Sequence, residues 1–184
     1  RVNENIGLTA VHHVFHSEHN RLVEHIKEIV LSADATLLDE YQVSPGIWNG
    51  ERLFQAARFV TEMEYQHLAF EEFARKVQPQ VNVFDGYDAT IDAAITAEFS
   101  QAAYRFGHSI LPEVLARTHD GTSNTIDLFD AFLNPLAFDE NDSLTPDEAA
   151  GSLFQGLTHQ IANALDPFIS ESVRNTLVGL PLDL

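Results

Sequence analysis

Apolar side chains recur at intervals of three, four and seven residues through most of this 184-residue chain, and no segment alternates as a strand does. This period places the apolar residues on one face of an α-helix. The spacing predicts three long helices, over residues 6–32, 51–77 and 89–116. Shorter helices are predicted over residues 147–156, 157–165 and 167–178. We therefore expect an all-α fold, with long buried central helices and short flanking helices.

Helix-boundary residues support these predicted elements. Asn49 is a preferred cap for the second helix, and Pro79 closes that helix. Thr145 and Glu148, with a proline between them, form the pattern of a capping box. A loop around Pro45 and a polar loop over residues 121–134 are expected between the helices.

Charge and composition exclude several classes of protein. The chain carries 28 acidic and 10 basic residues, a formal charge of −18, which repels nucleic acid and anionic membranes. Cysteine is absent, so disulfides, iron-sulfur clusters and thiolate-ligated haem have no ligands here. The chain shows neither a signal-peptide pattern nor a run of eighteen apolar residues. Its length suits one domain, which we place over residues 1–184.

The stretch Tyr104-Arg105-Phe106-Gly107-His108 carries the strongest chemical signal. Glycine inside a predicted helix costs about 1 kcal/mol, which is tolerated where a side chain would be in the way. Arg105 lies three residues before His108, on the same helix face, where it can reach a carboxylate. A haem has a flat ring and two propionates, so these residues suit a proximal haem ligand. The alternative is a core histidine bonded to a backbone carbonyl.

Other candidate metal motifs are weaker. His12, His16 and His19 share one helix face at ligand spacing, but they lack the glutamate that zinc proteases place after the first histidine. Glu64 and His67 form one copy of a pair that di-iron bundles use twice. Residues 139–143 resemble the start of a calcium loop without its glycine or its final glutamate.

Several spaced motifs together resemble the animal-type haem peroxidases, a myeloperoxidase-like family within the peroxidase-cyclooxygenase superfamily that has bacterial members. The motifs are Arg1 to Asn5, Leu8-Thr9, Glu18 to Leu22, Trp48 to Leu53, Gln55, Ala57-Arg58, Tyr104 to His108 and Gly179 to Leu184. They follow the family's order over the whole chain. The resemblance implies a mainly helical haem-peroxidase core, and we expect the chain to be the central and proximal part of a larger peroxidase domain.

The resemblance also implies roles for four residues. His108 matches the proximal axial ligand of the haem iron, and Arg105 matches an arginine near a propionate. Arg1 matches the distal catalytic arginine, which orients peroxide and stabilises the departing oxygen. Glu4 matches a glutamate that forms an ester to a haem methyl in some relatives. The implied cofactor is haem b, and calcium is implied only for the longer parent protein, with no site in this chain.

The implied reaction is peroxidase chemistry, with hydrogen peroxide and a small electron donor as substrates. The implied partner is the remainder of the peroxidase domain, without nucleic acid or membrane, and the implied location is extracellular. Asn5 stands where myeloperoxidase has a haem-bonded methionine, so strong chloride oxidation is not implied. Two alternatives stay open: a fatty-acid dioxygenase on the same scaffold, with Tyr104 as its only local radical candidate, and a non-catalytic metal-binding module using His12, His16 and His19.

Overall fold

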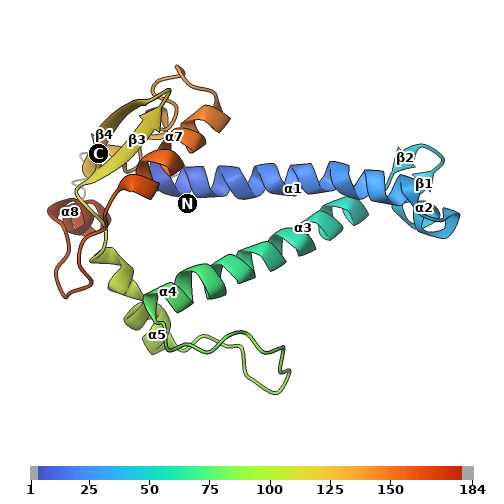
Figure 1. Cartoon of the computed structure of the whole chain (residues 1–184), viewed down its shortest axis with the longest axis horizontal. Helices are drawn as coiled ribbons and strands as arrows, with labels where there is room; N and C mark the ends of the chain where they lie inside the picture. The colour runs from blue at the N-terminus through green and yellow to red at the C-terminus, as the bar shows by residue number, and fades with distance from the viewer. Residues whose placement is uncertain (1–3, 180–184) are drawn as a thin grey trace. The chain divides into compact units, whose positions relative to one another are not determined.

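The computed structural model describes residues 4–179, and most of its regular elements are helices (Figure 1). The chain divides into two compact units. One unit combines Arg1–Val14 with Asp92–Leu184, and the other comprises Phe15–Ile91. Two short antiparallel hairpins are the only sheets among the described residues. The predicted mainly helical architecture is confirmed.

The first predicted helix has the expected bounds. Helix α1 covers Ile6–Ser32, and the side chain of Asn5 accepts a hydrogen bond from Leu8 N at 2.9 Å at its start. The next helix, α2, covers Ala35–Tyr41 and is capped by Asp34.

The loop predicted around Pro45 forms the turn of a small hairpin. Strands β1, Gln42–Ser44, and β2, Ile47–Trp48, pair on either side of it, and Gly46 adopts a φ of 79° there. Glycine takes this left-handed conformation without the steric cost that other residues meet.

The second long helix starts where its cap predicts but changes type towards its end. Helix α3 covers Gly50–His67, and Asn49 accepts a hydrogen bond from Arg52 N at 3.2 Å. A π-helix, η1, follows over Leu68–Ala74, and helix α4 completes it over Arg75–Val77. The 51–77 extent is therefore confirmed, while the wider helical turns of η1 were not predicted.

The other unit is built around a hairpin that the sequence analysis missed. Strand β3, Val114–His119, pairs in register with β4, Thr122–Asp127. The turn residues Asp120 and Gly121 have φ values of 47° and 74°, as a two-residue type I′ turn requires. The dipeptide Asp-Gly was the available sequence signal, and the period of three to four residues had masked it.

Helix α7, Pro146–His159, packs along β3 (Figure 1). Its capping box is confirmed, because Thr145 accepts from Glu148 N and Glu148 accepts from Thr145 N. Gly156 makes close packing on the strand feasible, since a Cβ there would lie 2.2 Å from the carbonyl oxygen of Ala116. The short elements α6, Leu128–Ala131, and η3, Pro135–Ala137, lie between β4 and α7 in the sequence.

We call the buried cluster around this hairpin the hairpin core. Its buried members are Ile6, Ala10, Leu115, Leu128, Ala131, Phe132, Ala150, Leu153 and Val173. Val173 comes from the last helix, α8, which covers Glu171–Gly179. The helices predicted over 147–156 and 167–178 are thus present in outline, whereas residues 160–165 are not helical.

The predicted third helix, residues 89–116, is wrong. Only α5, Ala97–Gln101, and a 3₁₀-helix, η2, Ala103–His108, form within it. The carboxylate of Asp88 binds the backbone N and hydroxyl of Thr90, and Asp92 binds Ala94 N. Such local bonds compete with helical ones.

Pro112 also ends any helix before β3, because proline lacks the N–H that a helix interior needs. The predicted burial of this stretch is wrong as well, since Ile95 is 72% exposed.

Candidate functional site

His108 ends the 3₁₀-helix η2, and its ring is half-buried. A 3₁₀-helix has three residues per turn, so residues three apart lie directly above one another. Arg105 therefore lies on the same face as His108, as the sequence predicted for a regular helix. Among the described residues, the His108 imidazole has no hydrogen bond or ion pair. The alternative of a core histidine bonded to a backbone carbonyl has no support here.

Gly107 lies beside this histidine in open space. A Cβ built on Gly107 meets no heavy atom within 4 Å, and its backbone does not require the left-handed region. The packing of the described chain therefore gives no reason for a glycine at this position. A flat group bound against the chain at this point would explain why the residue is a glycine.

Arg105 projects from the exposed side of η2. Its guanidinium lies 4.9 Å from the ring centroid of Tyr104, and that ring stacks on Phe99 at a centroid distance of 6.2 Å. These ring contacts hold the positive charge of Arg105 on a surface that is rich in exposed aromatic groups. Tyr104 is itself exposed in the described part of the chain.

The residues just after His108 are held by more hydrogen bonds from distant side chains than the residues just before it. Ser109 is buried, and both its N and its hydroxyl donate to Phe106 O, at 3.0 and 2.8 Å. We call residues 110–116 the post-histidine segment. Asn163 donates to Ile110 O and Leu111 O, at 3.0 and 2.9 Å.

Further bonds fasten the rest of the post-histidine segment. The amide of Gln160 donates to Val114 O at 2.7 Å and accepts from Ala116 N at 3.0 Å. The carboxylate of Glu113 accepts bonds from Glu171 N and the Ser172 hydroxyl at the start of α8. His108 thus stands where an exposed turn joins an anchored strand. These three anchoring side chains were not predicted, because polar residues outside a motif give no sequence signal.

The other two predicted site residues lie near the N-terminus. Glu4 is half-buried, and its carbonyl oxygen accepts from Leu133 N at 2.8 Å, which ties it to the end of α6. The next residue, Asn5, forms an isolated bridge with Phe132. Arg1 lies outside the described residues.

Two of the motifs named in the sequence analysis have structural roles. Arg21 donates to both carboxylate oxygens of Glu18 along α1, and this hydrogen bonding lowers the pKa of Glu18. The motif from Trp48 to Leu53 holds the cap that starts α3. Both motifs therefore describe how helices begin or are stabilised.

The histidines of α1 have other partners. His13 Nε2 lies 2.7 Å from a carboxylate oxygen of Asp147, and His19 Nε2 lies 3.2 Å from Phe54 O. Within residues 4–179, no group of three or more histidine, aspartate or glutamate side chains could hold a metal ion. The metal-binding-module alternative and the Glu64 and His67 pair thus have no geometric support. A haem iron is held differently, since one protein ligand is enough.

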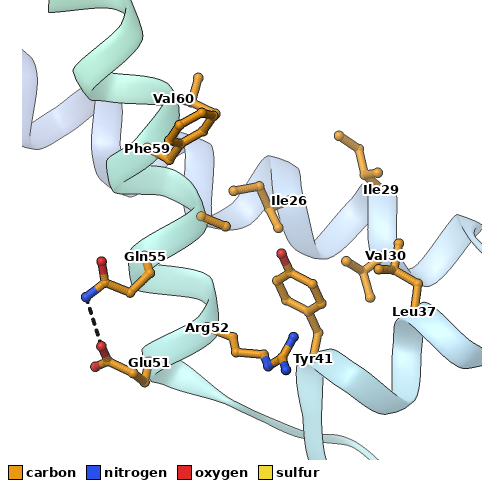
Figure 2. A pocket seen from close by; sticks show the side chains of 11 residues that line it. Ile26, Ile29, Val30, Leu37, Tyr41, Glu51, Arg52, Gln55, Phe59 and Val60 are labelled. Atoms are coloured by element: carbon orange, nitrogen blue, oxygen red, sulfur yellow. Dashed lines mark hydrogen bonds between the residues drawn. The ribbon is translucent and has the colours of Figure 1, made fainter. Parts of the chain in front are cut away.

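The unit Phe15–Ile91 contains two cavities that the sequence did not predict. One, of about 660 Å³, lies between α1, α2 and α3 and is mainly apolar, and Figure 2 shows Tyr41 reaching into it beside Arg52. Arg52 is already paired with Glu40, at 3.1 Å. The other, of about 1010 Å³, lies along η1. Neither cavity is lined by a predicted haem-site residue.

Among the described helices, none is long and apolar enough to cross a membrane.

Comparisons with known proteins agree with the motif order. The family model described as animal haem peroxidase matches residues 1–184. The chain is 31% identical over 131 residues to peroxidase mlt-7 of Caenorhabditis elegans, covering 68% of this chain and 16% of that protein. It is 28% identical over 183 residues to peroxinectin A of Dictyostelium discoideum, covering 98% of this chain and 30% of that protein.

A solved structure has a similar fold. Peroxidase A from Dictyostelium discoideum matches with a TM-score of 0.75 and 24% identity, over 94% of this chain and 30% of that chain. The chain thus spans less than a third of each of these relatives.

Proposed function

The chain belongs to the animal haem peroxidase family, and from that premise we propose that His108 is the proximal ligand of a haem iron in a peroxidase. The observation that carries the proposal is the Gly107-His108 pair. The imidazole lacks a partner among the described residues, and the neighbouring position has open space where a side chain would stand. A neutral imidazole is the usual protein ligand of haem iron, and a flat macrocycle needs such room.

Bound haem supplies the redox chemistry, the two-electron reduction of hydrogen peroxide. The chain's own residues have the role of binding the haem and orienting it. His108 would hold the metal through a ring nitrogen, and Arg105, one 3₁₀ turn earlier, would offer its guanidinium to a propionate. Among the described residues, the Arg105 guanidinium lies against the Tyr104 ring and makes no hydrogen bond or ion pair, so its donors are available.

Arg1 is proposed as the distal arginine. Arginine stays protonated at all working pH values, so Arg1 orients peroxide by donating hydrogen bonds and does not act as the base. The base that takes the peroxide proton is not among the residues assigned here. The peroxide reaction and the small electron donor therefore belong to the protein in which this chain works with the remainder of its domain, and we propose an extracellular location for it.

Glu4 is proposed to form an ester with a haem methyl group. Such an ester would join a Glu4 carboxylate oxygen to the methyl carbon, which would lose one hydrogen in a two-electron oxidation. Hydrogen peroxide would be the oxidant, reduced to two waters. Leu133 N donates to Glu4 O at 2.8 Å, which fixes the backbone of Glu4.

Haem absorption tests the ligand directly. The protein that carries this chain is expected to show a Soret band that His108→Ala abolishes. The control is His25→Ala, since His25 is an exposed histidine on α1 whose Nδ1 lies 3.7 Å from a carboxylate oxygen of Glu28. A Soret band that survives in the His108 variant would refute the assignment.

Two further variants test the other roles. Arg1→Ala is expected to slow the reaction with hydrogen peroxide while haem remains bound, and an unchanged rate would remove Arg1 from the mechanism.

Acidified organic solvent should fail to extract haem from the wild type and should extract it from Glu4→Gln. Free release from the wild type would mean that no ester forms.

A further inference from the structure

Asn163 makes an unusual pair of contacts for a residue outside any helix or strand. Its backbone N donates to Ile110 O at 3.0 Å, and its side-chain Nδ2 donates to Leu111 O at 2.9 Å. The side chain itself is exposed. Asn163 therefore adds nothing to the hairpin core by burial, and its two bonds act on two successive carbonyl groups.

Those carbonyl groups lie directly after the histidine. Only Ser109 separates His108 from Ile110, and Ser109 is buried with both donors on Phe106 O. Each residue has two backbone dihedral angles that rotate easily. Because Ser109 is fixed and is the only residue between His108 and Ile110, few rotations can move the histidine relative to the Asn163 contacts. The direction of the His108 Cα–Cβ bond is thus set by bonds on both sides of Ser109.

Asn163 is itself held in place by helix α7. Gln160, at the end of α7, binds Val114 O and Ala116 N. The four residues from Gln160 to Asn163 then run back along the post-histidine segment towards His108. The side chains of Asn163 and Gln160 bind the post-histidine segment near its two ends. Gly156 allows α7 to lie close to that segment.

We propose that Asn163 is a positioning residue for His108. By holding Ile110 and Leu111, it fixes the backbone of the histidine turn and so the angle at which the imidazole meets the haem iron. The inference rests on the proposed function, because it takes His108 as the iron ligand. Its effect on the turn, however, is measurable without haem.

The haem-free experiment measures hydrogen exchange at Ser109 N, which is bonded to Phe106 O. Asn163→Ala removes one donor to Leu111 O, and Asn163→Asp places an acceptor against that carbonyl. We expect Ser109 N to exchange about tenfold faster in the alanine variant, and faster still in the aspartate variant. The matched control is Asn134→Ala, since Asn134 donates a similar side-chain bond, 3.0 Å, to Asp130 O away from the histidine.

The haem-bound experiment measures haem affinity and the iron–histidine stretching band in the resonance Raman spectrum of the intact protein. Loss of a hydrogen bond to a metal ligand itself typically weakens binding by 10–100-fold. Asn163 acts on the backbone two and three residues beyond His108, so its effect should lie at the low end of that range. We expect haem binding about tenfold weaker in Asn163→Ala, with a shifted or broadened stretching band, and no change in Asn134→Ala.

The outcomes separate the two proposals. Ser109 exchange that is the same in Asn163→Ala as in the wild type overturns the positioning role, whatever happens to haem. Equal effects of the Asn163 and Asn134 variants on the stretching band overturn it too, because a general loss of stability would then explain both. A wild-type protein without a His108-dependent Soret band refutes the proposed function, and faster Ser109 exchange would still establish Asn163 as the residue that orders the turn.

Discussion

Gly156 and Gly107 both lie in helical turns of the same unit, yet only Gly156 is explained by the packing around it. A side chain at Gly156 would collide with the backbone of Ala116 and Arg117, whereas one at Gly107 would meet nothing within 4 Å. The first glycine packs on strand β3 beside the hairpin core. The second belongs to residues 92–109, which we call the histidine segment.

The same contrast runs through the apolar residues of the two regions. Leu153 in the hairpin core is fully buried, and Ile95 in the histidine segment is 72% exposed. The difference teaches that the hairpin core is determined by contacts within the chain. Packing within the described chain does not explain the apolar residues of the histidine segment.

The largest effect should come from the centre of the hairpin core. Leu153→Ala leaves a cavity among fully buried neighbours and should lower the free energy of unfolding by about 4 kcal/mol. Ile95→Ala in the histidine segment should change it by less than about 0.5 kcal/mol. Chemical denaturation of both variants measures the difference. Similar losses at the two sites would end the distinction between the regions.

The two glycines provide the next test. Gly156→Ala forces helix α7 away from β3 and should cost about 3 kcal/mol of stability, since its Cβ would meet backbone atoms that cannot rotate away. Denaturant midpoints of the variant and the wild type measure this. A loss below about 1 kcal/mol would mean that α7 can move off the strand cheaply.

Loss of a helix cap should likewise cost more stability beside the hairpin core than in the histidine segment. Thr145 caps α7, and Thr145→Ala should cost about 1 kcal/mol. Thr96 caps the five-residue helix α5 in the histidine segment, and Thr96→Ala should have a smaller effect because α5 has no buried residue. Thermal unfolding of the two variants compares them. A larger loss at Thr96 would show that the histidine segment contributes to stability of the chain.

The α7 cap should also depend on pH. Hydrogen bonds from the backbone and hydroxyl of Thr145 lower the pKa of Glu148 below its ordinary value of 4.5. A depressed pKa adds stability that is present above 4.5 and is lost as the pH falls through the lowered value. The stability difference between the wild type and Glu148→Gln should therefore shrink on acidification. A constant difference between about pH 7 and about pH 3 would contradict the capping-box contribution.

The smallest change in stability is expected at Gly107. Gly107→Ala should not destabilise the haem-free chain, because its Cβ has open space and alanine restricts the unfolded chain more than glycine does. The same substitution should weaken haem binding, which a titration followed at the Soret band measures. If the variant bound haem as well as the wild type, the open space beside His108 would have no role in the cofactor site.

Sequence reasoning predicted best the elements whose stability is local. Helix α1 and the Asn49 and Thr145 caps are set by neighbours a few residues away, so periodicity and capping rules found them. The hairpin was missed although Asp120-Gly121 signals one, because its long-range packing on α7 cannot be read from apolar spacing.

The site was predicted in its motif but not in its support. Tyr104 to His108 is a continuous stretch that can be recognised in one sequence. The contacts of Asn163 and Gln160 join residues more than forty positions apart, and no local pattern encodes them. The long helix predicted around the site failed because its apolar stripes were taken to imply burial, and Asp88, Asp92 and Pro112 were given too little weight.

The π-helix η1 determines which change of length this part of the chain can absorb. A π-helical turn holds about one residue more than an α-helical turn, so deleting one residue between Leu68 and Ala74 and restoring regular turns would leave α4 facing nearly the same direction. The same deletion within the regular helix α3 would rotate everything that follows by about 100°. Descendants of this sequence should therefore accept a single-residue deletion within η1 more readily than one within α3.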